Sequence, residues 1–326
     1  MKSLAKMIAP ATFMLSVSWT GLPQAQTAGR PLTLMVPTSS ATAADITSRL
    51  IQPRLQERYG MPVVVENRTG ASGAIGMGAV ARAAPDGNTV LMSPSTLAMI
   101  NLLQKDLGWN PVNDLQPVAR LVSLYYVIVV NPALPVHNVN ELIALAKSKP
   151  GKLNFSTPGV GTPHHLVTEL FKQMTRVHVV HIPYKTSAGA VTDLAGGHVD
   201  FAFQALHSVL PLVNAGKLRL IATVTDARTP WTPETPTLKE SGIEGVVINS
   251  WVGAFLPKNA PREMAEKLSR EIAAILNTPE VKEELLKGGI VVNHGGPDEM
   301  AALLKRDTAL WKRVVDEGRI VLDDTK

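Results

Sequence analysis

Apolar and polar positions along this chain repeat with two periods, one typical of strands and one typical of helices. Short apolar runs predict strands at residues 32–36, 63–66, 89–92, 118–121, 125–131, 153–155, 177–182, 201–203, 219–224 and 250–256. Apolar residues spaced three and four apart predict helices at 45–59, 74–84, 139–148, 163–174, 187–195, 208–215, 261–277, 279–287 and 297–317. Strands that alternate with helices of this length are typical of an α/β fold with parallel strands.

The length of the chain is sufficient for two domains with full cores. It has 326 residues, of which 45% are hydrophobic and 18% charged, so the composition is that of a globular protein. Two extended apolar segments, 125–131 and 250–256, are expected to cross between two lobes. We therefore predict lobe 1 from residues 29–127 plus 252–326 and lobe 2 from residues 128–251.

The N-terminus has the pattern of a secretory signal peptide. Lys2 and Lys6 form a basic region, and the apolar stretch 7–19 is too short to span a bilayer. Small residues offer cleavage sites after Ala25 or Ala28. We therefore expect residues 1–28 to be a signal peptide and the mature protein to be periplasmic, with a buried N-terminal helix as the alternative.

Composition excludes several classes of function. The chain has no cysteine, so it has no disulfide, no lipoprotein anchor and no thiol nucleophile. No later apolar stretch approaches the length of about 20 residues that a membrane-spanning helix needs. Without Lys2 and Lys6 the formal charge falls from +5 to +3 (5 − 2), and this small excess is spread along the chain. Nucleic-acid binding is therefore not indicated.

Two loops have the chemistry of an anion-binding site. Residues 36–45 read V-P-T-S-S-A-T-A-A-D, and residues 156–163 read S-T-P-G-V-G-T-P. Each follows a predicted strand and begins a predicted helix, where unpaired backbone N–H groups and the positive end of the helix dipole attract anions. Hydroxyl residues in such loops are also common turn formers, so that interpretation stays open. Two such loops on two lobes predict a cleft that binds a small anion from both sides.

The residues predicted to bind the ligand are all polar and lie at or near the ends of predicted strands. They are Ser39, Ser40, Thr42, Asp45, Ser95, Thr96, Thr157, Thr162, His165, Thr186 and Gln204. Asp45 has two possible roles, as a helix-start residue that accepts free N–H groups or as a group that orients the loop or contacts the ligand. His165 is interpreted as a hydrogen-bonding residue at a helix start. Trp251 is interpreted as an anchor in the core or between the lobes.

Six segments, in order along the chain, resemble one known family. Residues 64–73 read V-V-E-N-R-T-G-A-S-G, and residues 81–89 read A-R-A-A-P-D-G-N-T. The others are P-G-K-L-N-F at 150–155, H-I-P-Y-K at 181–185, D-L-A-G-G-H-V-D at 193–200 and P-T-L-K-E-S-G at 236–242. These segments resemble the receptors of the tripartite tricarboxylate transporters, also called Bug proteins.

The resemblance implies a fold and a function. It implies a two-lobed fold of the type II periplasmic-binding-protein kind, with two mixed sheets flanked by helices and a ligand cleft between the lobes. It implies a periplasmic solute-binding protein that captures a small organic anion and delivers it to the integral-membrane permease subunits. The expected protein is a monomer without enzymatic activity, cofactor or metal. A ligand-binding sensor without a transport role remains an alternative.

The chain departs from the family pattern at several loop positions. In the first loop, Thr38 replaces an aromatic residue, and Ala41 and Thr42 replace two glycines. Thr186 replaces the glycine after the P-Y-K motif, and Gln204 replaces an acidic residue that is common in the family. These changes lie on the loops expected to line the cleft, so they bear on the ligand and leave the transport class intact.

Residues 69–76, T-G-A-S-G-A-I-G, provide a rival interpretation. A glycine-rich turn between a strand and a helix is typical of dinucleotide binding, which would make the protein a Rossmann-type oxidoreductase. The spacing is glycine at every third position, which differs from G-x-G-x-x-G, and no tyrosine has a lysine four residues later. A tight turn that requires small residues is the simpler interpretation.

Histidines and serines do not form a recognisable catalytic or metal motif. His164 and His165 begin a predicted helix with Glu169 on the face of His165, whereas His178 and His181 point to opposite faces of a strand. A zinc site needs three or four converging ligands, and none of the usual spacings occurs. No G-x-S-x-G elbow indicates a serine hydrolase. We therefore predict a binding protein and no metal centre.

Overall fold

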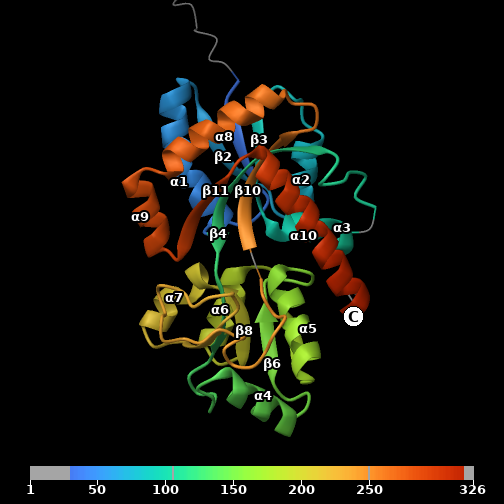
Figure 1. Ribbon diagram of the computed structural model, residues 1–326, viewed down its shortest axis with the longest axis vertical. Helices are drawn as coiled ribbons and strands as arrows, with labels where there is room; N and C mark the ends of the chain where they lie inside the picture. The colour runs from blue at the N-terminus through green and yellow to red at the C-terminus, as the bar shows by residue number, and fades with distance from the viewer. Residues whose placement is uncertain (1–29, 105, 249, 319–326) are drawn as a thin grey trace, which may run out of the picture.

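Two mixed β-sheets, one above the other in Figure 1, form the framework of the computed structural model, which describes residues 30–104, 106–248 and 250–318. The first sheet contains β1 (Leu32–Val36), β2 (Val63–Asn67), β3 (Thr89–Pro94), β4 (Leu115–Leu124), β10 (Ser250–Pro257) and β11 (Ile290–Gly295). The second contains β5 (Tyr126–Val130), β6 (Asn154–Thr157), β7 (Val180–Pro183), β8 (Phe201–Ala205) and β9 (Arg219–Thr223). This is the two-lobed α/β fold that the sequence predicts.

Helices flank both sheets. The first lobe includes α1 (Ala43–Tyr59), α2 (Ala74–Ala81), α3 (Ile100–Leu103), α8 (Arg262–Leu276), α9 (Pro279–Lys287) and α10 (Pro297–Gly318). The second includes α4 (Val139–Ser148), α5 (Pro163–Thr175), α6 (Ser187–Ala195) and α7 (Leu206–Asn214). Short 3-10 turns, η1 (Ala71–Gly73) and η2 (Ser95–Met99), precede α2 and α3. Most helix bounds lie within two residues of those predicted from periodicity.

Five strands of the first sheet are arranged like the five strands of the second. Read from β2, the first sheet runs β2-β1-β3-β10-β4 and adds β11, and the second runs β7-β6-β8-β5-β9. In each, two parallel pairs are followed by one antiparallel strand, β10 beside β3 and β5 beside β8. Strand β1 therefore corresponds to β6, and α1 corresponds to α5. This correspondence makes the two loops singled out in the sequence equivalent positions of two similar lobes.

The carboxyl ends of the parallel strands point toward the other sheet. The chain leaves β4 and enters β5 through Tyr125, so the end of β4 and the start of β5 lie where the sheets meet (Figure 1). Because β3 and β8 run antiparallel to β10 and β5, the ends of β1, β3, β6, β7 and β8 also lie on the facing edges. Ligands of open α/β sheets bind outside such carboxyl ends.

The segments expected to cross between the lobes are regular strands. Strand β5 pairs with β8 and β9 along its whole length, and β10 pairs with β3 and β4. The first passage is the single residue Tyr125 between the end of β4 and the start of β5, and β10 begins at Ser250, on the same edge of the first sheet where β4 ends. The division at residues 127/128 and 251/252 stays a proposal.

Strand β11 is absent from the sequence prediction. Only three of its residues, Ile290, Val291 and Val292, form an apolar run, which is too short to distinguish a strand from a turn between helices. It pairs with β4 at the edge of the first sheet, and tertiary pairing supplies the order that its own residues do not.

The apolar core is continuous across the two sheets. One buried cluster includes Leu34 and Phe255 of the first sheet together with Phe155 and Phe203 of the second. A smaller cluster around Val127 and Val129 lies under α6 and α7. The lobes are therefore packed against one another by buried apolar side chains, as well as linked by the two passages of the chain.

Candidate functional site

The loop between β1 and α1 is organised by its own hydroxyl groups. Thr42 is the N-cap of α1: its Oγ1 accepts a hydrogen bond from the Asp45 N–H at 3.4 Å and donates to the Ser39 carbonyl at 3.1 Å. Thr38 Oγ1 lies 2.7 Å from Thr42 Oγ1. Ser39 is half-buried and Ser40 is exposed. The loop is therefore ordered from within, and the first-turn N–H groups before Asp45 have no intrahelical acceptor.

Asp45 fixes the shape of this loop. Its buried carboxylate accepts hydrogen bonds from Ala41 N–H, Asn67 Nδ2 and Arg49 Nε at 2.9–3.0 Å. Burial raises the pKa of Asp45, but hydrogen bonds from Arg49, Asn67 and Ala41 outweigh it, so the pKa lies below the ordinary value. Asn67 also donates to the Thr38 carbonyl at 3.0 Å. These bonds account for both carboxylate oxygens and hold the loop against α1 and β2, so the geometry describes the loop-orienting role, and contact with a ligand stays a prediction.

The loop between β6 and α5 repeats this arrangement. Thr162 is the N-cap of α5, and its Oγ1 accepts from His165 N–H at 3.4 Å and donates to the Gly159 carbonyl at 2.8 Å. The Gly161 N–H donates to His165 Nδ1 at 3.1 Å, as Ala41 N–H donates to Asp45. His165 Nδ1 is therefore an acceptor, which places the proton of the neutral ring on Nε2.

Aromatic and charged side chains pack behind this second loop. The His165 and His181 rings stack with centroids 4.3 Å apart, and His181 stacks on Phe155 at 4.9 Å. Burial, with the His181 ring and Lys172 as lesser causes, lowers the pKa of His165 to about 3. Burial, with Lys172 as a lesser cause, lowers the pKa of His181 to about 4. Thr157 Oγ1 lies 2.6 Å from His181 Nε2 and donates to the Gly159 carbonyl. The Thr157 hydroxyl is thus occupied within the lobe.

Ser95 and Thr96 follow β3 in the turn η2 and are both buried. Ser95 Oγ lies 2.9 Å from the Oγ of Ser250, the first residue of β10. Tyr126, the first residue of β5, also hydrogen-bonds to Ser250. Ser95 therefore belongs to a hydroxyl chain that links both passages between the sheets.

Thr186 and Gln204 lie at the ends of β7 and β8. Thr186 is the N-cap of α6 and accepts from the Gly189 N–H at 3.1 Å. Gln204 is fully buried, with its Oε1 3.5 Å from Ser187 Oγ in the first turn of α6. Its Nε2 has no hydrogen-bond partner among the residues that the structure describes. Gln204 thus offers two unpaired N–H donors beside a helix start.

Backbone contacts show which predicted residues lie together. In lobe 1, Asn67 links the end of β2 to the β1–α1 loop, and Gly73 approaches Pro37. In lobe 2, the Tyr184 carbonyl lies beside Gly159, so the β7–α6 turn adjoins the β6–α5 loop. Leu103 of α3 lies against the second lobe here, because a Cβ on Gly161 would come within 1.9 Å of it. The predicted residues therefore form two groups on facing edges.

Several residues of the site escape sequence reasoning. Arg49 pairs with Asp45 one turn away on the same helix, and Asn67 lies in the family segment 64–73 but bonds to Asp45 and Thr38, which are distant in the chain. Leu103 lies beside Gly161, and no local motif marks it. Ala41 has φ of 63°, in the left-handed region that glycine normally occupies, and Gly161, at the equivalent place of the second loop, has φ of 71°.

The glycine-rich segment 69–76 is a packed turn. A Cβ on Gly76 would lie 2.5 Å from the Arg68 carbonyl and 3.1 Å from Pro37, and Gly70 and Gly73 have φ of 118° and 96°. Close approach to β1 and left-handed backbone therefore account for the glycines without a dinucleotide.

Two other histidines lie near the junction of the sheets. His164 packs against the Tyr126 ring at 4.9 Å, and burial lowers the pKa of His164 to about 3 and that of His207 to about 4. Neither Nδ1 has a hydrogen-bond partner within the described ranges. Within those ranges, no three acidic or histidine side chains cluster as metal ligands would.

The sequence also predicts a signal peptide and no later membrane-spanning helix. The predicted signal peptide, residues 1–28, lies outside the described residues. None of the helices that the structure describes has the length and apolar character needed to cross a membrane.

Comparison with known proteins identifies the family. The model of the tripartite tricarboxylate transporter family receptor matches residues 47–320. The chain is 33% identical to Protein BugT of Bordetella pertussis over 290 residues, which cover 88% of this chain and 89% of BugT.

Solved structures agree with this match. Rpa4515 of R. palustris with adipate superposes with a TM-score of 0.85 at 33% identity, covering 90% of this chain and 98% of that one. MatC from Rhodopseudomonas palustris with bound malate gives a TM-score of 0.80 at 26% identity, covering 88% and 99%. The chain therefore belongs to the tripartite tricarboxylate transporter family of receptors.

Proposed function

We propose that this protein is a periplasmic receptor that binds a small organic anion through a carboxylate group and delivers it to a membrane permease. One observation carries the proposal: five strand ends with neutral hydrogen-bond donors lie on the facing edges of two similar sheets. Two of them lead into helices with the same capping scheme. Unpaired backbone N–H groups at such helix starts donate hydrogen bonds to anionic acceptors such as a carboxylate.

The relatives support the chemical class. The solved structure of Rpa4515 contains adipate and that of MatC contains malate, and both are small carboxylates. Both proteins cover most of this chain at more than 25% identity. We infer a carboxylate ligand for this chain, without naming which one, because the loops differ from the family pattern at Ala41, Thr42, Thr186 and Gln204.

The hydrogen bonds within the loops indicate which groups remain free to bind a ligand. The hydroxyls of Thr42 and Thr162 already donate to carbonyl oxygens, so in this proposal the ligand meets backbone N–H groups of the first helical turns. Ser40 is exposed, and the described residues include no hydrogen-bond partner for its side chain, so its hydroxyl is available. Neutral donors suit a receptor that must release its ligand, because an Arg–carboxylate pair binds more strongly.

The proposal extends to what surrounds the binding step. The lobes take residues 29–127 plus 252–326 and residues 128–251, the ligand lies between them, and the protein acts as a monomer without enzymatic activity. Residues 1–28 direct export to the periplasm. A sensor without transport would have the same site, and binding to purified permease subunits distinguishes the two.

A ligand screen with matched variants tests the proposal. Purified mature protein is heated with linear carboxylates, tricarboxylates, aromatic carboxylates and their neutral amides, and affinities of stabilising compounds are measured by calorimetry. A ligand at 100 times its Kd adds about 2.7 kcal/mol to the free energy of unfolding. Ser40→Asp should weaken carboxylate binding at least about tenfold, because it places a negative charge against the ligand.

The control is Asn140→Asp. Asn140 is exposed in the first turn of α4. This helix follows the carboxyl end of β5, which points away from the first sheet, and the change adds the same charge. It should leave affinity unchanged. Equal binding of carboxylates and their amides, or an unaffected Ser40→Asp variant, would overturn the anion site.

A further inference from the structure

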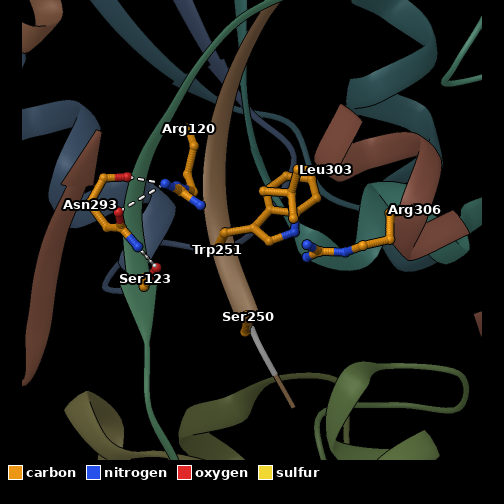
Figure 2. Close-up of a pocket in the computed structure, with 7 residues that line it drawn as sticks. All are labelled: Arg120, Ser123, Ser250, Trp251, Asn293, Leu303 and Arg306. Atoms are coloured by element: carbon orange, nitrogen blue, oxygen red, sulfur yellow. Dashed lines mark hydrogen bonds between the residues drawn. The ribbon is translucent and has the colours of Figure 1, made fainter. Parts of the chain in front are cut away.

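A second polar pocket lies beside the first sheet and adjoins the predicted ligand residues through Ser250, whose Oγ lies 2.9 Å from that of Ser95. It has a volume of about 210 Å³ and is lined by residues of β4, β10, β11 and α10 (Figure 2): Arg120, Ser123, Ser250, Trp251, Asn293, Leu303 and Arg306. None of the eleven residues predicted to bind the ligand lines it. We call it the β4–α10 pocket.

Arg120 forms one side of this pocket. Its Nε donates to the Asn293 carbonyl at 2.8 Å and its Nη2 to Asn293 Oδ1 at 2.9 Å. Asn293 Nδ2 in turn donates to Ser123 Oγ at 2.9 Å. This chain of bonds fixes the guanidinium group and leaves its Nη1 without a recorded partner among the described residues. The Ser123 hydroxyl accepts from Asn293, so its proton remains available.

Arg306 forms the opposite side. Its Nε and Nη2 each lie 3.1 Å from Asp307 Oδ1. The other Asp307 oxygen accepts from the indole Nε1 of Trp251 at 2.8 Å. The buried Asp307 is therefore satisfied, and it orients both the guanidinium and the indole. Figure 2 shows Arg120 and Arg306 reaching toward Trp251 from opposite sides.

Two carboxylates compete with an incoming anion for these guanidinium groups, Glu299 beside Arg120 and Asp307 beside Arg306. Glu299 Oε2 lies 3.7 Å from Arg120 Nη2, and the Glu299 side chain is 69% exposed. An ion pair this long and exposed is worth little, so an incoming anion can displace it. Asp307 already pairs with Nε and Nη2 of Arg306, so an anion would meet Arg306 mainly through Nη1. The pocket thus presents two guanidinium groups, each beside one carboxylate, and one hydroxyl donor; the Arg306 side chain is 63% exposed.

We propose that the β4–α10 pocket is a second anion site, which takes a small oxyanion such as a carboxylate or phosphate between Arg120 and Arg306. Guanidinium groups bind the oxygens of both classes by paired N–H donors. The volume accommodates an anion of a few heavy atoms and excludes a drug-sized molecule. All lining residues belong to strands and helices of the first sheet, so this site does not require the other lobe.

Calorimetry with inorganic phosphate and with acetate, at constant ionic strength and with chloride as the replaced anion, tests the proposal. Both probes should bind, and the tighter one identifies the preferred class. Arg306→Gln should weaken binding by about five- to tenfold. Glu299→Gln should tighten it severalfold, because the competing carboxylate is removed. The Glu299 side chain is exposed, so Glu299→Gln is expected to fold normally and its effect on binding can be interpreted directly.

Two controls separate this site from general charge and from the proposed ligand site. Arg313→Gln removes the same charge from an exposed position on the same helix and should leave binding unchanged. Ser40→Asp should leave phosphate binding unchanged. The site is overturned if neither probe binds at tens of millimolar, if Arg313→Gln weakens binding as much as Arg306→Gln, or if Glu299→Gln has no effect.

Discussion

The β1–α1 and β6–α5 loops have the same hydrogen-bonding scheme but use different side chains as the acceptor. In both, an N-cap threonine, Thr42 or Thr162, bonds the N–H three residues ahead and a carbonyl three residues behind. In both, the third helical residue accepts a backbone N–H from the residue before the cap. The acceptor is the ionised Asp45 in lobe 1 and the neutral ring of His165 in lobe 2.

The neighbours of each loop account for the difference. Asp45 has the cationic Arg49 one turn along α1 and the Asn67 amide beside it, which stabilise a buried carboxylate. His165 lies between the His181 ring and Glu169, whose carboxylate already pairs with Lys172 at 2.6 Å. A second carboxylate there would face Glu169. The loop geometry therefore requires an acceptor, and the surroundings decide whether it carries charge.

The largest expected difference between the two loops is in how their stability changes at low pH. The pKa of His165 falls from 6.5 to about 3 on folding, so below pH 6.5 the unfolded chain binds the proton first. The free energy of unfolding then decreases by about 1.4 kcal/mol per pH unit for this residue until the pH nears its folded pKa. Asp45 has a lowered pKa, so its contribution is present above pH 3.8 and is lost only below that value.

Urea unfolding and hydrogen exchange between pH 7 and pH 4.5 test this difference. Amides at 162–166 should lose protection while those at 43–47 keep theirs, after correction for intrinsic exchange rates. His165→Gln retains an acceptor without a titrating group, so it should reduce the pH slope of stability by about 1.4 kcal/mol per unit. Equal loss of protection in both loops would contradict the assignment.

Removing the charged acceptor should have the next largest effect. Asp45→Ala leaves the Ala41 N–H and the Asn67 amide unpaired in a buried place, and it should cost about 2–3 kcal/mol of unfolding free energy in urea titrations. Asp298→Ala is the control, because Asp298 lies in the first turn of α10 but its side chain is 81% exposed. The control should cost less than about 1 kcal/mol; similar losses in both variants would refute a special role for Asp45.

Gly161→Ala should cost about 1–3 kcal/mol. The new Cβ would meet Leu103 Cδ2 at 1.9 Å, and alanine is strained at φ of 71°. The double variant Gly161→Ala/Leu103→Ala separates these causes, because it removes the clash and leaves the strain. It should be less destabilised than the sum of the single variants, and simple additivity would show that the two residues do not touch.

Ala41→Gly should have the smallest effect and the opposite sign. Ala41 already occupies the left-handed region at φ of 63°, so glycine relieves about 1 kcal/mol of strain and loses part of it to chain entropy. We expect a stabilisation of about 0.5 kcal/mol in urea titrations. A destabilised variant would mean that the Ala41 methyl makes contacts that outweigh the strain.

The sequence predicted most of the elements, because helix and strand periodicity records which face of each element is buried. Helices such as 139–148, 187–195 and 279–287 coincide with α4, α6 and α9. Strand β11 was missed and β7 was displaced, because short edge strands carry little pattern of their own. The predicted ligand residues lie between the carboxyl ends of strands and the first turns of the helices that follow, whereas their contact with a ligand stays a prediction.

By itself the sequence determined the family, the two lobes and the two hydroxyl-rich loops, since these depend on local pattern and on motifs in order. Only the tertiary structure decided that Asp45 and His165 are equivalent, that Leu103 reaches Gly161 across the lobes, and that Arg120 and Arg306 face one pocket. Those relations join residues far apart in the chain, and the pairing of strands brings them together. No local sequence pattern specifies how the strands pair, because the pairing is determined by burying the apolar faces of both sheets together.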